Sequence, residues 1–307
     1  MLDEWIFGSA NRISPEAPVP VLRLTERKTA PGGAANVAMN ILRLGARVRV
    51  VGVVGSDEAG RDLSRELEEA GADVSGLVCD GARPTTLKTR IVAQRQQMVR
   101  VDRESDETFS QTVRDELNAR LQSALRDAAI LCVSDYDKGM AACGVLAQAV
   151  KMAQSSDRSS TRLRVTGGPK PHNMNCFVQS DFLSLNQKEA SEASGLKLDS
   201  DEAVEAAGEA LRQSSQSRAL VITRGGRGVS LFRADAKTLH IAAHEVEVFD
   251  VAGAGDSFLA AATVALAGGA DALRASEIGN IAAAASVRHV GVVAVTPEEV
   301  RRVAQEI

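Results

Sequence analysis

The chain has 307 residues, enough to bury a large core and near the upper limit for one domain. Hydrophobic residues make up 44% and charged residues 25%, the proportions of an ordinary globular protein, and the formal net charge of −4 argues against a nucleic-acid partner. No apolar run reaches the roughly 18 residues of a membrane span and no signal peptide is present, so we expect a cytoplasmic protein that binds a small molecule. Four widely spaced cysteines predict free thiols: Cys79, Cys132, Cys143 and Cys176.

Predicted helices and strands alternate along the chain. Residues 34–44 place apolar side chains on one helical face before Gly45, and the β-branched run 47–55 is typical of a strand buried on both faces. The same rhythm continues with a helix at 63–70, a strand at 129–134, a helix at 144–153, a strand at 181–185, a helix at 201–212 and a strand at 219–223. This alternation predicts an α/β fold: a doubly wound, mostly parallel sheet flanked by helices, as a single domain over 1–307.

Two stretches depart from this rhythm. Residues 19–26 and 86–102 alternate apolar with polar side chains, which is typical of a sheet with one covered and one wet face. We expect a small antiparallel β lid with strands at about 12–28 and 84–104, although an edge hairpin of the main sheet has the same pattern. The polar stretch 154–164 predicts a loop.

The segment from Phe249 to Leu266 carries the strongest chemical signal. An apolar strand is expected to run into Gly253-Ala254-Gly255, after which Asp256 opens an Ala-rich helix. Free amides at a helix N-terminus bind a phosphate or a developing anion, and a carboxylate beside them can take a proton from an attacking alcohol. The alternative is that Asp256 only caps the helix.

Other polar positions follow predicted strands or open predicted helices. The glycine-rich turn from Thr223 to Gly228 could cradle a nucleotide phosphate or form an ordinary hairpin. Gly32-Gly33 with Asn36 could bind sugar hydroxyls or form a capped turn. Asn186 and Glu189 could cap a helix or hold magnesium through water. The chain has neither a P-loop nor a dinucleotide fingerprint, and His240 and His244 lack further metal ligands nearby.

In this order, these motifs resemble the ribokinase-like (PfkB-type) carbohydrate kinases over nearly the whole chain. The shared elements are Gly32-Gly33 with Asn36, Asn186-x-x-Glu189, Thr223-x-Gly225-x-x-Gly228 and Gly253-Ala254-Gly255-Asp256. The stretch Arg12–Val21 further resembles the signature of the D-glycero-β-D-manno-heptose-7-phosphate kinases. Similar stretches of that subfamily are Lys88-Thr89-Arg90, Gln96-Gln97 with Arg100-Val101-Asp102, and Ser134-Asp135-Tyr136-x-Lys138-Gly139.

The resemblance implies an ATP-dependent kinase that phosphorylates a sugar phosphate, with Mg²⁺ as a cofactor. It assigns catalysis to Asp256 with Gly253, Ala254 and Gly255, nucleotide binding to Asn186, Glu189 (also magnesium), Thr223, Gly225, Gly228 and Asn280, and sugar binding to Asp3, Gly32, Gly33, Asn36 and Lys88. We add Arg90 and Arg100 as contacts to the sugar phosphate, since guanidinium groups suit bidentate phosphate binding. Asp250 stands where K⁺ could be held, and pairing of lids implies a homodimer. In bacteria, such a kinase would feed ADP-heptose and lipopolysaccharide core synthesis.

Three departures from the family pattern keep alternatives open. Family members have a buried strand ending in Gly-Asp before the Leu-Asp that matches Leu2-Asp3, so we expect the sheet of this sequence to lack that strand. Gly168 stands where the subfamily has Asp before Pro-Lys, and Ala252 stands where Thr is common. The rival readings are a kinase for another sugar or a nucleoside, and a degenerate, non-catalytic protein that binds a sugar or nucleotide.

Overall fold

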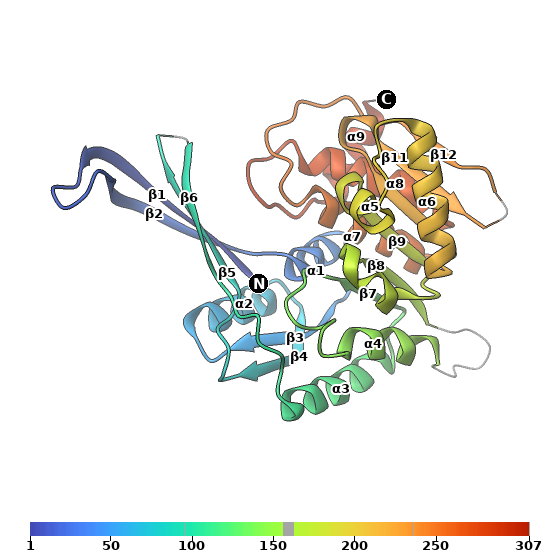
Figure 1. Ribbon diagram of the computed structural model, residues 1–307, viewed down its shortest axis with the longest axis horizontal. Coiled ribbons are helices and arrows are strands. Elements are labelled where there is room, and N and C mark those ends of the chain that lie inside the picture. The colour runs from blue at the N-terminus through green and yellow to red at the C-terminus, as the bar shows by residue number, and fades with distance from the viewer. Residues whose placement is uncertain (95, 156–162, 235, 307) are drawn as a thin grey trace.

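The computed structural model describes residues 1–94, 96–155, 163–234 and 236–306 (Figure 1). The strands are β1 (Leu2–Ile13), β2 (Pro20–Pro31), β3 (Arg49–Gly55), β4 (Asp73–Asp80), β5 (Leu87–Ala93), β6 (Gln96–Arg103), β7 (Ile130–Ser134), β8 (Arg164–Gly168), β9 (Phe182–Asn186), β10 (Ala219–Thr223), β11 (Val229–Arg233) and β12 (Leu239–Ile241). The helices are α1 (Ala34–Arg43), α2 (Glu58–Glu69), α3 (Gln111–Leu125), α4 (Val145–Gln154), α5 (Gln187–Ser194), α6 (Asp201–Ser215), α7 (Ala254–Ala267), α8 (Ala272–Ser286) and α9 (Pro297–Gln305), with short 3₁₀ helices η1 (Pro171–Phe177) and η2 (Gly225–Arg227). The predicted alternation of helices and strands is confirmed, but the prediction of an apolar strand before Gly253 is wrong, since residues 242–252 form an irregular segment.

The main sheet has the order β12-β11-β10-β9-β8-β7 and is parallel from β7 to β10. Successive residues of β10 enter different cores: Leu220 and Ile222 pack with α4 and α6, whereas Val221 packs with α7 and α8. Because side chains alternate across a strand, this pattern places helices on both faces of the sheet. The predicted doubly wound α/β architecture is therefore confirmed.

A separate two-stranded parallel sheet is formed by β3 and β4. The strand predicted at 47–55 is present, but the prediction that it is buried on both faces is wrong: most of β3 is only half-buried. The reason is that β3 pairs with β4 along one edge, and no described strand pairs with its other edge. The sheet of β3 and β4 is therefore separate from the main sheet, whose last strand is β7.

The four-stranded sheet β2-β1-β5-β6 projects from the body of the molecule (Figure 1). This sheet is separate from the main one, so the edge-hairpin alternative is wrong. The expected boundaries need two corrections, since β1 starts at Leu2 and β2 continues to Pro31. The sheet is also mixed instead of purely antiparallel, because β1 runs parallel to β5. We call it the projecting sheet.

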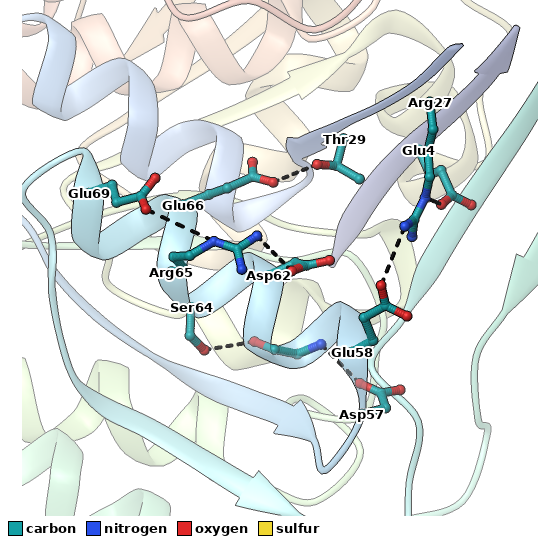
Figure 2. Close-up of polar contacts among 11 residues, drawn as sticks. Glu4, Arg27, Thr29, Asp57, Glu58, Asp62, Ser64, Arg65, Glu66 and Glu69 are labelled. Carbon is teal, nitrogen blue, oxygen red and sulfur yellow. Dashed lines mark hydrogen bonds and ion pairs between the residues drawn. The ribbon is translucent and has the colours of Figure 1, made fainter. Parts of the chain in front are cut away.

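Helix α2 anchors the base of the projecting sheet (Figure 2). The Arg27 guanidinium lies between two carboxylates, with Nε 2.5 Å from Glu4 Oε1 and one terminal nitrogen 3.4 Å from Glu58 Oε1. The Thr29 hydroxyl donates to Glu66 Oε1 at 2.6 Å. These contacts fix the base of β1 and β2 against the body, which positions the site residues at the start of β1.

Two smaller expectations can be compared directly. All four cysteines are free thiols, as predicted. Of the predicted loop at 154–164, residues 156–162 lie outside the described residues. Within the described ranges, no helix is both long and apolar enough to cross a bilayer.

Candidate active site

Three parallel strands bring polar residues to one edge of the main sheet. Lys170 follows β8, Asn186 ends β9, and Thr223 ends β10. Asn186 and Thr223 are direct register partners, so these two predicted nucleotide residues lie side by side. The carboxyl end of a parallel sheet is the usual place for a ligand in an α/β fold.

Asp256 lies in the first turn of α7 and is only 9% exposed. Its two carboxylate oxygens accept separate hydrogen bonds, from the Tyr136 hydroxyl to Oδ1 at 2.6 Å and from Asn36 Nδ2 to Oδ2 at 2.8 Å. Burial raises the pKa of the Asp256 carboxyl to about 6, although both hydrogen bonds act in the opposite direction. The alternative in which Asp256 only caps the helix is wrong, because Gly253 is the N-cap residue.

The glycines before Asp256 leave the helix N-terminus accessible. Gly253 adopts φ +80°, a left-handed conformation that suits glycine. The Ala254 amide donates to the Val251 carbonyl at 3.3 Å, whereas Gly255 is exposed and, among the described residues, its amide has no backbone acceptor. An exposed free amide beside a buried carboxylate is an arrangement that can bind an anion next to a base.

Asn36 is held in place by a buried polar network at the start of α1. Asn40 Nδ2 donates to the Asn36 carbonyl at 3.0 Å and to its Oδ1 at 3.2 Å. The Ser257 hydroxyl donates to Asn40 Oδ1 at 3.0 Å. This network ties α1 to α7 and fixes the orientation of the amide that contacts Asp256.

Neighbouring side chains approach the backbone so closely at positions 32 and 33 that only glycine fits there. A Cβ on Gly32 would lie 2.0 Å from Asp3 Oδ2, and one on Gly33, which has φ +57°, would lie 3.1 Å from the Tyr136 ring. Asp3 is buried and accepts a hydrogen bond from Arg90 at 2.5 Å. The structure therefore places Gly32 against Asp3 and Gly33 against Tyr136, whose hydroxyl donates to Asp256.

The other two predicted cationic residues, Lys88 and Arg100, lie on β5 and β6 of the projecting sheet. Lys88 is the register partner of Asp3 on β1, and its Nζ lies 3.0 Å from Asp102 Oδ2. Arg100 is half-exposed and also pairs with Asp102, at 2.9 Å. Arg90 and Arg100 stand directly opposite each other on β5 and β6. Each of the two guanidinium groups is paired with a carboxylate, Arg90 with Asp3 and Arg100 with Asp102.

Asn186 and Glu189 form a capping box at the start of α5. The Glu189 amide donates to Asn186 Oδ1 at 2.8 Å, and Glu189 Oε2 accepts from the Asn186 amide at 3.0 Å. Glu189 Oε1 also lies 2.6 Å from Lys170 Nζ, and that ammonium stands 5.3 Å from the centre of the Tyr136 ring. The capping interaction is thus present in the structure. Lys170 also connects Glu189 to the ring of Tyr136, whose hydroxyl donates to Asp256.

A second group of predicted nucleotide residues surrounds residues 241–243. A Cβ on Gly228 would lie 2.0 Å from the Ile241 carbonyl oxygen, and Asn280 Nδ2 donates to the Ala242 carbonyl at 2.7 Å. Gly225, by contrast, faces open space. Between described residues, no hydrogen bond joins this group to Asp256.

Asp250 and the two departing positions also have defined surroundings. Asp250 accepts hydrogen bonds from the amides of Ala252 and Gly291, both at 3.0 Å. A Cβ on Gly168 would lie 3.3 Å from Leu259, so the site of the missing carboxylate is closely packed. The nearby Asp135 carboxylate is buried and accepts a hydrogen bond from the Lys170 backbone amide at 3.1 Å. In the described part of the chain, no group of three or more His, Cys, Asp or Glu residues could hold a metal alone.

Two residues near the site, Tyr136 and Lys170, have no predicted catalytic or binding role from the sequence. Each lies next to Asp256 or Glu189, yet their partners are distant in the chain, which hides the contact from any local pattern. The available signal was position, because both residues directly follow parallel strands at the edge where ligands bind.

Comparisons with known proteins agree with this geometry. Residues 5–299 match the family described as pfkB family carbohydrate kinase. The bifunctional protein HldE of Geobacter sulfurreducens is 40% identical over 304 residues, and that of Paramagnetospirillum magneticum is 39% identical over 292 residues. These alignments cover 98% and 95% of this chain, but only 60% and 59% of the respective relatives.

Solved structures share the fold at low sequence identity. Phosphofructokinase-2 from Escherichia coli, in complex with substrates and products, superposes with a TM-score of 0.81 at 20% identity, over 99% of this chain and 95% of that one. Arabidopsis thaliana ribokinase, complexed with ribose and ATP, gives 0.76 at 17% identity, over 98% and 95%.

Proposed function

Because the chain belongs to the pfkB family of carbohydrate kinases, we propose that it transfers the γ-phosphoryl group of ATP to D-glycero-β-D-manno-heptose 7-phosphate. The observation that carries this proposal is the buried Asp256 carboxylate beside the exposed Gly255 amide. The choice of heptose rests on the signature in Arg12–Val21, and similarity to the HldE proteins supports it. The 1,7-bisphosphate product would supply ADP-heptose and lipopolysaccharide core synthesis.

Asp256 acts as the general base in this proposal. Its carboxylate takes the proton of the sugar hydroxyl while the hydroxyl oxygen bonds to the γ-phosphorus and the bond to the β–γ bridging oxygen breaks. The pKa near 6 leaves the carboxylate mostly ionised at neutral pH yet more basic than an ordinary aspartate. The amides of Ala254 and Gly255, with Gly253 opening the helix, stabilise the charge on the transferred group.

ATP and Mg²⁺ fit the edge formed by β8, β9 and β10. Thr223, Gly225, Gly228 and Asn280 would line the nucleotide, and Asn186 with Glu189 would hold Mg²⁺ through water. Mg²⁺ usually takes few protein ligands and several waters beside phosphates, so the half-buried Glu189 carboxylate could contact it through water. When bound, the ion would neutralise phosphate charge. Lys170, already 2.6 Å from Glu189, supplies a further positive charge near the phosphates.

The sugar phosphate would occupy the space between Asp256 and the projecting sheet. Asp3, Gly32, Gly33, Asn36 and Lys88 would contact the sugar. Arg90 and Arg100 would bind its 7-phosphate, since they are register partners on β5 and β6 and guanidinium groups suit phosphate binding.

K⁺ is a further proposed ligand, held near Asp250. This carboxylate ties the loop before α7 to Gly291, so a cation there would order the segment that opens the catalytic helix. Support comes from E. coli phosphofructokinase-2, which has been solved in complex with potassium and shares the fold with a TM-score of 0.82.

The projecting sheet is also the proposed dimer interface. Six large apolar side chains on this sheet and on the turn between β1 and β2 are about half exposed or more, which is unusual for a monomer surface. They are Ile13, Val19, Leu24, Met98, Val99 and Val101. Pairing two projecting sheets in a homodimer would cover these side chains.

The proposal is tested by ADP release with Mg²⁺–ATP and a panel of acceptors: heptose 7-phosphate, ribose, fructose and adenosine. We expect turnover with the heptose phosphate alone. Turnover with another acceptor would show that this sugar or nucleoside, and not the heptose phosphate, is the substrate. If a folded protein binds ATP but turns over no acceptor, the chain is a non-catalytic binding protein and the proposal fails.

A further inference from the structure

One face of the projecting sheet begins at the proposed sugar site. Because side chains alternate across a strand, Asp3, Trp5 and Phe7 of β1 point to the same face. Asp3 lies at the base of this face and packs against Gly32. Trp5 comes next and is only half-buried, so part of its indole is open to a ligand. It is the only tryptophan in the chain.

Trp5 holds the guanidinium group of Arg90. The two residues are register partners on the parallel strands β1 and β5, and the guanidinium carbon of Arg90 lies 5.2 Å from the centre of the Trp5 ring. One terminal nitrogen of Arg90 donates to Asp3 Oδ1 at 2.5 Å. Between described residues, no hydrogen bond uses Nε or the other terminal nitrogen, and these two N–H groups form an edge that can bind a phosphate in bidentate fashion. The ring and the carboxylate thus orient the guanidinium and leave this edge free.

The far edge of the indole reaches the body of the molecule. A Cβ on Gly291 would lie 3.9 Å from Trp5 Cζ2, the distance of an ordinary van der Waals contact. The Gly291 amide donates to Asp250 Oδ2 at 3.0 Å, and Asp250 stands just before α7, which carries Asp256. Trp5 therefore spans the distance between Arg90 on β5 and the loop after α8.

An indole in this position suits a sugar. The C–H groups of a sugar pack against an aromatic face, and sites for small molecules are mostly apolar, with a few polar groups that fix orientation. The residues proposed to contact the sugar are all polar or glycine, so Trp5 supplies the large apolar surface that they lack. The cation–π contact with Arg90 also becomes stronger when a bound sugar excludes water from it.

We propose that Trp5 is a specificity-determining residue, whose indole forms the apolar wall of the sugar site and orients Arg90 toward the phosphate of the acceptor. This inference rests on the proposed function and narrows its substrate class to phosphorylated sugars with a C–H surface between the phosphate and the reacting hydroxyl. A sugar without the phosphate gains only the contact with the wall and leaves the free edge of Arg90 unpaired, so it binds more weakly.

The first test compares Trp5→Leu with a matched control, Phe7→Leu. Phe7 lies on the same face and also under a cation, with Lys28 Nζ 5.6 Å from the centre of its ring, but it is one step further from the sugar site. We expect Trp5→Leu to raise KM for heptose 7-phosphate about tenfold, with kcat and KM for ATP within about twofold of the wild type. Trp5→Phe, which keeps an aromatic ring, and Phe7→Leu should both stay within about threefold of the wild type.

The second test uses the fluorescence of Trp5, which is assignable because the chain has one tryptophan. Heptose 7-phosphate is added without ATP to the wild type and to Phe7→Leu. We expect a saturable change in emission in both proteins, with a midpoint within about threefold of KM for the sugar phosphate.

The outcomes separate this inference from the proposed function. An unchanged KM for heptose 7-phosphate in Trp5→Leu, or equal increases of KM for both substrates, would overturn the inference while turnover by the wild type supports the proposed function. Emission that stays constant at a saturating concentration of the sugar phosphate would also overturn the inference. Absence of turnover by the wild type would instead overturn the proposed function, and the titration alone then shows whether a bound sugar phosphate contacts Trp5.

Discussion

Removing the Tyr136 hydroxyl should shift the pH dependence of the enzyme. In Tyr136→Phe, Asp256 loses the 2.6 Å hydrogen bond to Oδ1 and keeps the 2.8 Å bond from Asn36. Burial and the nearby Asp256 charge raise the pKa of the Tyr136 phenol, so the hydroxyl is protonated and acts as the donor. The phenyl ring also keeps the aromatic face that stands against Lys170.

The size of the shift follows from the strength of one charge-assisted hydrogen bond. Such a bond contributes about 1.5–3 kcal/mol, and one pKa unit corresponds to about 1.4 kcal/mol. Allowing for partial replacement by water, we expect the pKa of Asp256 to rise by about one unit from its value of about 6. Because the carboxylate is the active form, kcat/KM should fall roughly fivefold at pH 6 and stay nearly unchanged above pH 8.5.

The assay is kcat/KM for the sugar phosphate from pH 5.5 to 9, in parallel for both proteins. Ser180→Ala is the matched control, since it removes a buried hydroxyl that donates to the Phe177 carbonyl at 2.7 Å. The control should keep the wild-type profile. An unshifted acid limb in Tyr136→Phe, or a loss of equal size at every pH, would refute the reasoning.

Three further predictions concern stability and assembly. Gly228→Ala should lower the free energy of unfolding in urea by roughly 1–3 kcal/mol, because φ is +77° and a Cβ would meet the Ile241 carbonyl; an unchanged midpoint would contradict this. Burial acts to raise the pKa of Asp57, but hydrogen bonds from a threonine hydroxyl and two backbone amides outweigh it and hold the pKa below 3.8. The stabilisation by Asp57 is therefore present above pH 3.8 and lost as the pH falls through the lower folded value, so Asp57→Asn should be less stable at pH 7 by about 1 kcal/mol and equally stable near pH 2. In sedimentation velocity, Val99→Glu should convert the proposed dimer to a monomer, while Val248→Glu, at an exposed valine outside the projecting sheet, should leave it dimeric; a monomeric wild-type protein would rule out the interface.

The parts of the fold predicted from sequence are those set by local pattern. The run Phe182–Asn186 is apolar enough to identify a buried strand, and α1 shows its apolar face before Gly45. Membership of the carbohydrate kinase family was likewise expected from motif order and is confirmed. In these cases the signal lies within a short stretch of chain.

The errors arose where neighbours decide the outcome. β1 has no regular alternation, and its extended conformation is determined by pairing with β2 and β5. The β-branched sequence of β3 is that of a central strand, but its burial depends on a neighbour that no described residue supplies. The contact of Tyr136 with Asp256 joins residues 120 positions apart. No local pattern contains such information.

The central claim is that Asp256 activates the sugar hydroxyl for phosphoryl transfer. The most direct measurement is ³¹P NMR of the products from Mg²⁺–ATP and heptose 7-phosphate, with wild-type protein and with Asp256→Asn. We predict a new anomeric phosphate signal and ADP for the wild type, and for the variant at least a hundredfold slower reaction with ATP affinity within about twofold. Equal rates of product formation by the two proteins would contradict the claim.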